Sequence, residues 1–366
     1  MNNSEKVEIE RPGDIDALIK FASLPLQVYS DRPICWQHDV GVEVDLISGR
    51  APIASHLNLA PLWVRRKSRL LARVTAAVNH RYNRHWNEKL GQLLHFEAMP
   101  GEDEPVFQML ERAVELLKHQ GMTAARAGFA AFLDYPFAID NYGDLPPALL
   151  RGNPAYYHCY FKRAGFVTEK GLADYTAEFN PQLIERYKQM VEAARRGGFS
   201  IQSWREYGFF AAIDAWTDVI NAAFDRHWGW NPVSREEVRP LLMPLGNSPV
   251  ADLSVIASDG GSPVGAVFSV PDMSTSIVRV RPGLKISPER GGGTRGALVN
   301  IGVLEPWRGR GINLAMAARS FLSMHDQGIR FAGYTLVLDD NWASRRTAER
   351  LGARVTSNFV VYRRDF

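Results

Sequence analysis

The chain has 366 residues, of which 46% are hydrophobic and 23% charged. This composition is typical of a folded globular protein and excludes a disordered or fibrous one. The formal net charge of +3, from 43 basic and 40 acidic residues, gives no excess that would favour nucleic-acid binding. The length is more than one hydrophobic core usually organises, so two domains are expected.

The cysteines and the N-terminus narrow the class of protein further. Cys35 and Cys159 are far apart and lie in no metal-ligand spacing, which argues against a disulfide framework and a zinc site. The polar start, Met1 to Lys6, lacks the apolar segment of a signal peptide. No run approaches the roughly 18 apolar residues of a membrane span. We therefore expect a cytoplasmic protein with no metal and no membrane partner.

The first half of the chain predicts a strand, a turn and a helix in succession. The apolar run 93–99 indicates the strand, and apolar residues recur along one helical face over 106–117. A basic last turn followed by Gly121 is expected to end this helix. A further helix led by Asn153 is expected to end at Gly165.

A charged helical stretch, 181–196, separates the two halves and ends in a pair of glycines. We expect one domain over residues 1–180 and a second over 200–366. The second begins with helical pieces between 209 and 245. Two apolar runs follow, joined by Asp259-Gly260-Gly261, and this sequence predicts a β-hairpin.

The basic segment 275–295 contains glycine and proline and is expected to form a long loop. It would either be a solvated insertion or a lid or dock for an acidic acceptor or an acyl carrier protein. After it, the order of parts in the first half recurs. Residues 297–304 predict a strand, the following helix ends at Gly328, and an Asn341-led helix ends at Gly352. The repeated order indicates an internal duplication.

A glycine-rich turn with two arginines, Arg308-Gly309-Arg310-Gly311, joins the strand and helix of the second copy. The N–H groups at a helix start attract an anion, and glycines let the backbone approach a phosphate closely. The turn is not a P-loop, because no Gly-Lys-Ser/Thr follows. A dinucleotide fingerprint would need glycine at Leu314 and a longer downstream domain.

The turn resembles the acetyl-coenzyme A loop of the GNAT superfamily of N-acetyltransferases, Arg/Gln-x-x-Gly-x-Gly/Ala. Here it reads Arg308 to Asn313, with asparagine at the position that is usually small. The Asn341-led helix resembles the helix that follows in that family. The resemblance covers 200–366 through these motifs and 10–175 through the repeat. It implies an α/β (α+β) fold of two GNAT-like domains, each with a mixed, mostly antiparallel sheet flanked by helices.

The first copy has Glu102-Asp103-Glu104 in the equivalent turn, where carboxylates would repel a pyrophosphate. It is therefore expected not to bind coenzyme A. In the second copy, the resemblance implies acetyl-coenzyme A or another acyl-coenzyme A as donor substrate. The residues implied in holding the donor are Ile301, Val303, Arg308, Gly309, Arg310, Gly311, Ile312, Asn313, Asn341 and Ser344.

Four side chains are candidates for the chemistry. The family's frequent acid is a tyrosine seven residues after the asparagine, where this chain has Ala348, so Tyr334 and Tyr362 on neighbouring strands are considered instead. Glu305 and His227 are candidates for the base. In the family, a backbone N–H of the strand before the loop binds the oxyanion, here between Ile301 and Val303.

The sequence thus favours an N-acyltransferase that moves an acyl group from coenzyme A to a primary amine of a small molecule. No nucleic-acid partner is expected, and a homodimer is considered. Two alternatives stay open at this point. One is a coenzyme A-binding regulatory or catalytically silent protein, and the other is a Fem-like aminoacyl transferase.

Overall fold

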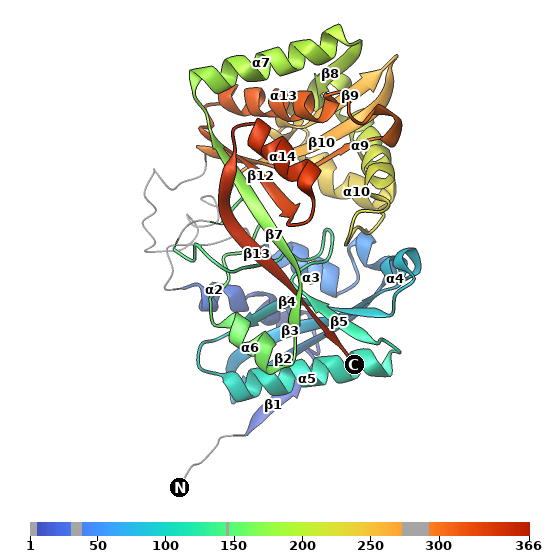
Figure 1. The fold of residues 1–366 in the computed structure, drawn as a ribbon. Coiled ribbons are helices and arrows are strands. Elements are labelled where there is room, and N and C mark those ends of the chain that lie inside the picture. The colour runs from blue at the N-terminus through green and yellow to red at the C-terminus, as the bar shows by residue number, and fades with distance from the viewer. Residues whose placement is uncertain (1–5, 31–38, 144–145, 273–292) are drawn as a thin grey trace. The chain divides into compact units, whose positions relative to one another are not determined.

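The computed structural model describes residues 6–30, 39–143, 146–272 and 293–366 (Figure 1). The chain divides into two compact units. Unit 1 is Met1–Asp144, Arg151–Gly171 and Phe359–Phe366, and unit 2 is Leu145–Leu150 and Leu172–Asn358. Most of the predicted loop 275–295 lies outside the described residues. Its last residue, Arg295, was wrongly assigned to the loop, because it begins a strand.

The sheet of unit 1 has the order β1-β2-β3-β4-β5-β13, with β6 also paired to β13. All these pairs are antiparallel except β4–β5. The strands are β1 Val7–Glu10, β2 Leu57–Arg66, β3 Arg69–Asn79, β4 Leu90–Ala98, β5 Ala124–Ala127, β6 Phe137–Ala138 and the end of β13 Arg354–Asp365. Every residue of β4 is buried, which fits its central place in the sheet.

The helices of unit 1 are α1 Ile15–Ala22, α2 Leu24–Val28, α3 Val40–Ile47, η1 Pro52–His56, α4 His80–Trp86, α5 Asp103–His119 and α6 Tyr157–Arg163. The predicted apolar face of α5 is buried against β2 and β3. Gly91 permits close packing, because a Cβ there would lie 2.5 Å from Leu117. The helix predicted from Asn153 starts only at Tyr157, because the Asn153 side chain bonds the Ala138 backbone instead of capping a helix.

The sheet of unit 2 has the order β7-β12-β11-β10-β9-β8, antiparallel except for β11–β12. Its strands are β7 Val167–Glu178, β8 Phe199–Ser203, β9 Val255–Asp259, β10 Ser262–Pro271, β11 Arg295–Val303 and β12 Phe331–Leu338. The predicted hairpin is confirmed: Gly260 and Gly261, both with positive φ, join β9 to β10.

The helices of unit 2 are α7 Pro181–Arg196, α8 Trp204–Tyr207, α9 Phe209–Phe224, α10 Arg235–Leu242, η2 Met243–Leu245, α11 Val250–Leu253, η4 Glu305–Trp307, α13 Ile312–Asp326 and α14 Trp342–Arg350. Helices α7 and α13 lie side by side (Figure 1). A Cβ at Gly265 would strike Met316 of α13, and one at Gly302 would strike Ala223 of α9. Gly265 pairs with Val303, the residue after Gly302. Because successive residues of a strand point to opposite faces, Gly265 and Gly302 face opposite sides of the sheet.

The division between the units differs from the one expected at residues 180–200. Strand β7 passes from unit 1 to unit 2 after Gly171, and β13 returns to unit 1 at Phe359. There, residues 362–365 pair with β5. Composition along the chain does not reveal this exchange, because strand partners are chosen by non-local packing.

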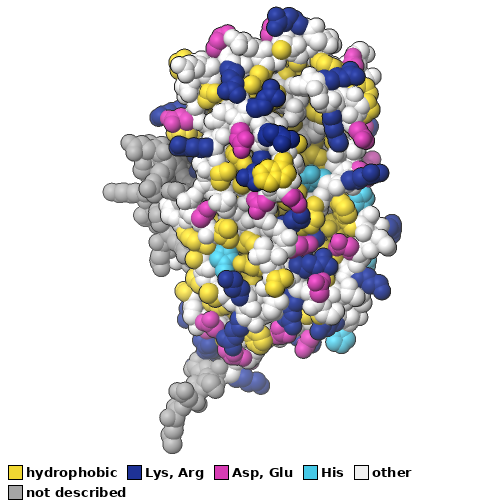
Figure 2. All heavy atoms as spheres, in the orientation of Figure 1, with side chains coloured by type: hydrophobic (Ala, Val, Ile, Leu, Met, Phe, Trp, Pro, Cys, Tyr) yellow, Lys and Arg dark blue, Asp and Glu magenta, His cyan; other side chains and the backbone are white. Residues whose placement is uncertain are grey.

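The surface carries charges of both signs. Basic and acidic side chains are interspersed on the visible face of each unit (Figure 2). Within the described part of the chain, no helix is long and apolar enough to cross a membrane.

Candidate functional site

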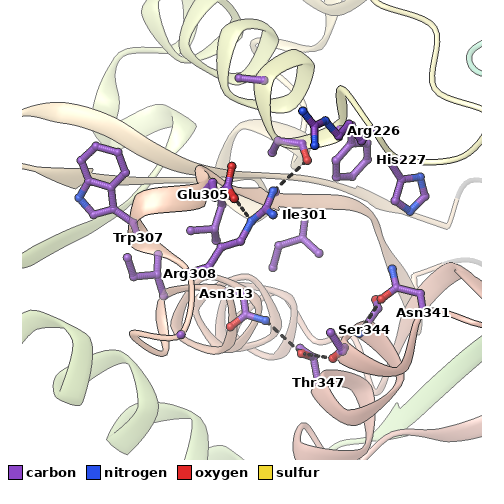
Figure 3. Close-up of a pocket in the computed structure, with 18 of the residues that line it drawn as sticks. Arg226, His227, Ile301, Glu305, Trp307, Arg308, Asn313, Asn341, Ser344 and Thr347 are labelled. Carbon is purple, nitrogen blue, oxygen red and sulfur yellow. Dashed lines mark hydrogen bonds between the residues drawn. The ribbon is translucent and has the colours of Figure 1, made fainter. Parts of the chain in front are cut away.

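A cavity opens in unit 2 where two parallel strands part. Strands β11 and β12 pair only over Arg295–Leu298 and Phe331–Tyr334, and the remainder of β11 follows β10 alone. The cavity has a volume of about 750 Å³. It is bounded by the end of β11, the start of α13, one face of α14 and residues 222–227 at the end of α9 (Figure 3). Beyond the last β11–β12 pair, the cavity is lined by Ile301, Gly302 and Val303 of β11.

The start of α13 at the cavity edge has free hydrogen-bond donors. Its N-cap, Gly311, is left-handed with φ 78°, and Gly309 has φ 79°. Among the described residues, no side chain caps the helix, and its first backbone bond is donated by Ala315 to Gly311. The preceding N–H groups of the first turn are therefore available to an anion.

The two arginines of the turn lie in different surroundings. The Arg308 guanidinium donates from Nε to the Val303 carbonyl at 3.0 Å and from Nη2 to the Ala223 carbonyl at 3.1 Å (Figure 3). Arg310 is exposed, and within the described parts of the chain it makes no hydrogen bond or ion pair. Residues Arg308, Gly309, Ile312 and Asn313 line the cavity, whereas Arg310 and Gly311 lie beside its lining.

Helix α14 contributes a polar wall. Asn341 is its N-cap and accepts from the Ser344 N–H at 3.1 Å. The Ser344 hydroxyl donates to the Tyr334 hydroxyl at 3.1 Å. Asn313, at the position that departs from the family pattern, donates to the Thr347 hydroxyl at 3.0 Å and so ties α13 to α14. All five residues line the cavity. Asn313, Asn341 and Ser344 were predicted to hold the donor and Tyr334 to take part in the chemistry, whereas Thr347 was not predicted.

The two candidate tyrosines have different positions. Tyr334 lines the cavity, and burial raises its pKa to about 12, so it keeps its proton at neutral pH. Tyr362 was wrongly placed by sequence proximity. It belongs to unit 1, pairs with Ala127 and contacts His158, because β13 leaves unit 2 before reaching this residue. Ala348 is fully buried in the core of unit 2 and does not face the cavity.

Both candidate bases line the cavity. The His227 ring stacks on Phe224 with centroids 4.9 Å apart, and burial lowers its pKa, so the imidazole is neutral at pH 7. Glu305 is exposed in η4, directly after β11. The neighbouring Trp307 donates from its indole to Asp259 at 2.9 Å, which fixes η4 against the β9–β10 hairpin.

The equivalent region of unit 1 is filled by its own side chains. Strands β4 and β5 also part after four paired residues, at Leu93 and Ala127. The Tyr157 hydroxyl accepts from the Ala98 N–H at 3.0 Å and donates to Glu97 at 2.6 Å. Tyr156 and Tyr160 bond the carbonyls of Ala98 and Met99. Sequence reasoning missed this filling, although the aromatic-rich run 156–161 was its visible signal.

Known proteins resemble this chain mainly in fold. No family model matches. A bacterial ceramide synthase of Caulobacter vibrioides (strain NA1000 / CB15N) is 22% identical over 281 residues, which is 75% of this chain and 72% of that protein. A tandem GNAT protein from the clavulanic acid biosynthesis pathway is 12% identical, with a TM-score of 0.59 and coverage of 98% of both chains.

Two further structures show the same architecture. The glucosamine N-acetyltransferase region of a fungal multi-domain GH3 beta-N-acetylglucosaminidase has a TM-score of 0.59 at 12% identity, over 99% of this chain and 38% of that one. This chain thus spans well under half of that longer protein. A GCN5-related N-acetyltransferase from Sphaerobacter thermophilus has a TM-score of 0.54 at 12% identity, with 98% and 95% covered. The chain therefore has the tandem GNAT fold, with one GNAT-like unit after the other.

Proposed function

We propose that unit 2 is an N-acyltransferase that moves an acyl group from a coenzyme A thioester to an amine. The observation that carries the proposal is the start of α13, where uncapped N–H groups and two left-handed glycines adjoin the cavity at the parted strands. Such a helix start suits a pyrophosphate. The GNAT fold supports acyl transfer in general.

The donor would be held by three groups of residues. The N–H groups that follow Gly309 and Gly311 would bind the pyrophosphate, and exposed Arg310 would add positive charge. A Cβ at either glycine would meet no atom within 4 Å beyond its chain neighbours, so no other part of the described chain covers the turn there. By the family resemblance, Asn341 at the start of α14 would contact the pantetheine arm, and Ser344 in the same helix lines the cavity beside it.

The side chains around the cavity suit the proton transfers of this reaction. His227, neutral at pH 7, would take the proton from the attacking amine as the new C–N bond forms. The backbone N–H groups between Ile301 and Val303 would bind the negative charge that develops on the thioester oxygen. Tyr334, which keeps its proton because of burial, would protonate the sulfur as the C–S bond breaks. Glu305 is a second proton acceptor to be tested at the same cavity.

The acceptor side of the cavity is partly apolar, because Ala222, Ala223, Phe224 and Ile301 line it. A ceramide is an N-acylated long-chain amino alcohol, and the ceramide synthase relative supports testing acceptors of this class. We therefore include sphinganine beside short polar amines and alkylamines as acceptors.

The test is release of free thiol from acetyl-, octanoyl- and palmitoyl-coenzyme A with each amine. We expect release that depends on the acceptor, and Tyr334→Phe should lower kcat by about 100-fold, because protonation of the leaving group is lost. The matched control is Tyr175→Phe. Tyr175 pairs with Tyr334 on the adjacent strand and is equally buried, but it does not line the cavity.

Three results would contradict the proposal or the part of it that concerns Tyr334. Binding of coenzyme A without turnover of any amine would favour the silent binding protein. Absence of coenzyme A binding, together with transfer from an aminoacyl-tRNA, would favour the Fem-like alternative. An equal loss of activity in both tyrosine variants would remove Tyr334 from the mechanism and leave a packing effect.

A further inference from the structure

Arg308 joins the two sides of the cavity in unit 2. Its guanidinium bonds the carbonyl of Val303, the last residue of β11, and that of Ala223 in the last turn of α9. The first belongs to the strand that leads into the turn before α13, and the second to the helix that leads into residues 224–227. One side chain therefore links the donor side of the cavity to its opposite wall (Figure 3).

The contact satisfies a specific need at the end of α9. The last carbonyls of a helix have no partner within the helix, and a cation is favourable at that end. Arg308 supplies both a donor and a charge to Ala223. The helix also approaches β11 closely here, since a Cβ at Gly302 would lie 2.9 Å from the Ala223 Cβ. The end of α9 is thus fixed to β11 by close packing and by the Arg308 fork.

The wall that follows depends on where α9 ends. His227 donates its backbone N–H to the Phe224 carbonyl at 2.7 Å, and its ring stacks on Phe224. Phe224 in turn meets Trp230 edge-on, with centroids 5.1 Å apart. A shift of Ala223 would therefore move Phe224 and His227 together, and both line the cavity.

Arg310, two residues further along the same turn, provides the contrast. It is exposed, and in the described ranges of the chain no partner holds it. The two arginines lie in the same loop, but the whole Arg310 guanidinium is available for a phosphate, whereas that of Arg308 is partly committed to the protein. Arg308 has already committed its Nε and one Nη to carbonyl oxygens.

We propose that Arg308 is a positioning residue that sets the acceptor wall, and that Arg310, not Arg308, supplies the charge for the donor's phosphates. This inference rests on the proposed acyl transfer. The sequence pattern indicated that both arginines hold the donor, whereas here only Arg310 has that role. It predicts that Arg308 controls the affinity for the amine through Phe224 and His227, with little effect on coenzyme A.

The experiment compares Arg308→Gln with Arg310→Gln in the full chain. Calorimetry with coenzyme A should show a Kd raised about 10-fold by Arg310→Gln and changed less than about 3-fold by Arg308→Gln, because one charged phosphate contact is worth roughly 1.4 kcal/mol. With octylamine as acceptor and saturating octanoyl-coenzyme A, Arg308→Gln should raise the KM for octylamine about 10-fold. Arg308→Lys, which keeps the charge but loses the planar fork, should fall between wild type and Arg308→Gln.

Hydrogen–deuterium exchange gives a readout that needs no substrate. Peptides covering 222–230 should exchange at least 5-fold faster in Arg308→Gln than in wild type, and at the wild-type rate in Arg310→Gln. Unchanged exchange in Arg308→Gln would overturn the positioning role whatever the protein binds. Loss of coenzyme A affinity in Arg308→Gln equal to that in Arg310→Gln would overturn it too. Failure of the wild type to bind coenzyme A would contradict the proposed function, while the exchange result would still decide on Arg308.

Discussion

The start of α5 in unit 1 and the start of α13 in unit 2 follow equivalent strands, but the first is acidic and the second has exposed N–H donors. Helix α13 begins after left-handed Gly311, without a side-chain cap and beside the cavity. Helix α5 begins after Glu102, and its first turn holds Asp103, Glu104 and Pro105, which has no N–H. A helix start therefore becomes an anion site only where the loop leaves donors exposed and adds no negative charge.

The regions next to these helix starts also differ, because that of unit 1 is packed with side chains and that of unit 2 is a cavity. In unit 1 the carboxylate of Glu102 is held by Arg66, with N–O distances of 3.1 and 2.8 Å. The space beyond the parted strands is packed with rings, among them Phe96 and Tyr157, whose centroids are 4.9 Å apart. In unit 2 the corresponding space is the cavity. Side chains therefore occupy this space in unit 1, whereas in unit 2 it is open to a ligand.

The largest effect should come from removing a ring that fills unit 1. Tyr157 is fully buried and bonds both Glu97 and the Ala98 N–H. We expect Tyr157→Ala to lower the stability of unit 1 by about 3–5 kcal/mol, since a large aromatic is lost and a buried donor is left unpaired. Exchange rates of amides in β4 and α5 measure this loss.

The matched control is Cys159→Ala on the exposed side of the same helix, which should change stability by less than about 0.5 kcal/mol. Equal exchange in wild type and Tyr157→Ala would contradict the view that packing closes unit 1. Binding of coenzyme A by unit 1 after the substitution would show that the tyrosine, and not the acidic turn, is what excludes it.

A smaller effect should appear as a pH dependence of unit 1. Burial raises the pKa of Glu97 to about 7, from an ordinary 4.5 in the unfolded chain. Between these values the folded state holds a proton that the unfolded state has lost, so stability falls as pH rises from 4.5 through 7. The change amounts to about 3 kcal/mol. Glu97→Gln should flatten this dependence in amide exchange of β4 measured from pH 5 to 8, and an unaltered slope would contradict the assignment to Glu97.

Local features of the fold were predictable because local chemistry determines them. Helix α7 has the predicted bounds, and Gly121 and Gly328 end their helices with positive φ. The parted strands of both units appear where the repeat placed a strand, a turn and a helix. In each case the signal was a residue type that a short-range conformation requires.

The features that could not be predicted depend on long-range packing or on side-chain direction. The return of β13 to unit 1 took Tyr362 out of the site, and no nearby residue signals it. The sequence of the loop indicated that both arginines bind the donor. Only the fold shows that Arg308 instead bonds the carbonyls of Val303 and Ala223. Periodicity likewise gives no sign that Ala348 faces the core.

The most direct test of the comparison is the affinity for coenzyme A, measured by calorimetry for wild type, Gly311→Ala and Gly328→Ala. The two glycines flank α13 and have φ near 80°. A methyl group added at either would meet no atom within 4 Å beyond the chain neighbours, and the similar φ means that alanine adds a similar backbone strain at both positions. Only Gly311 adjoins the N–H groups of the helix start. We expect that wild type binds, that Gly311→Ala raises Kd by about 10-fold or more, and that Gly328→Ala stays within about 2-fold. No binding by wild type, or equal affinities in all three proteins, would contradict this expectation.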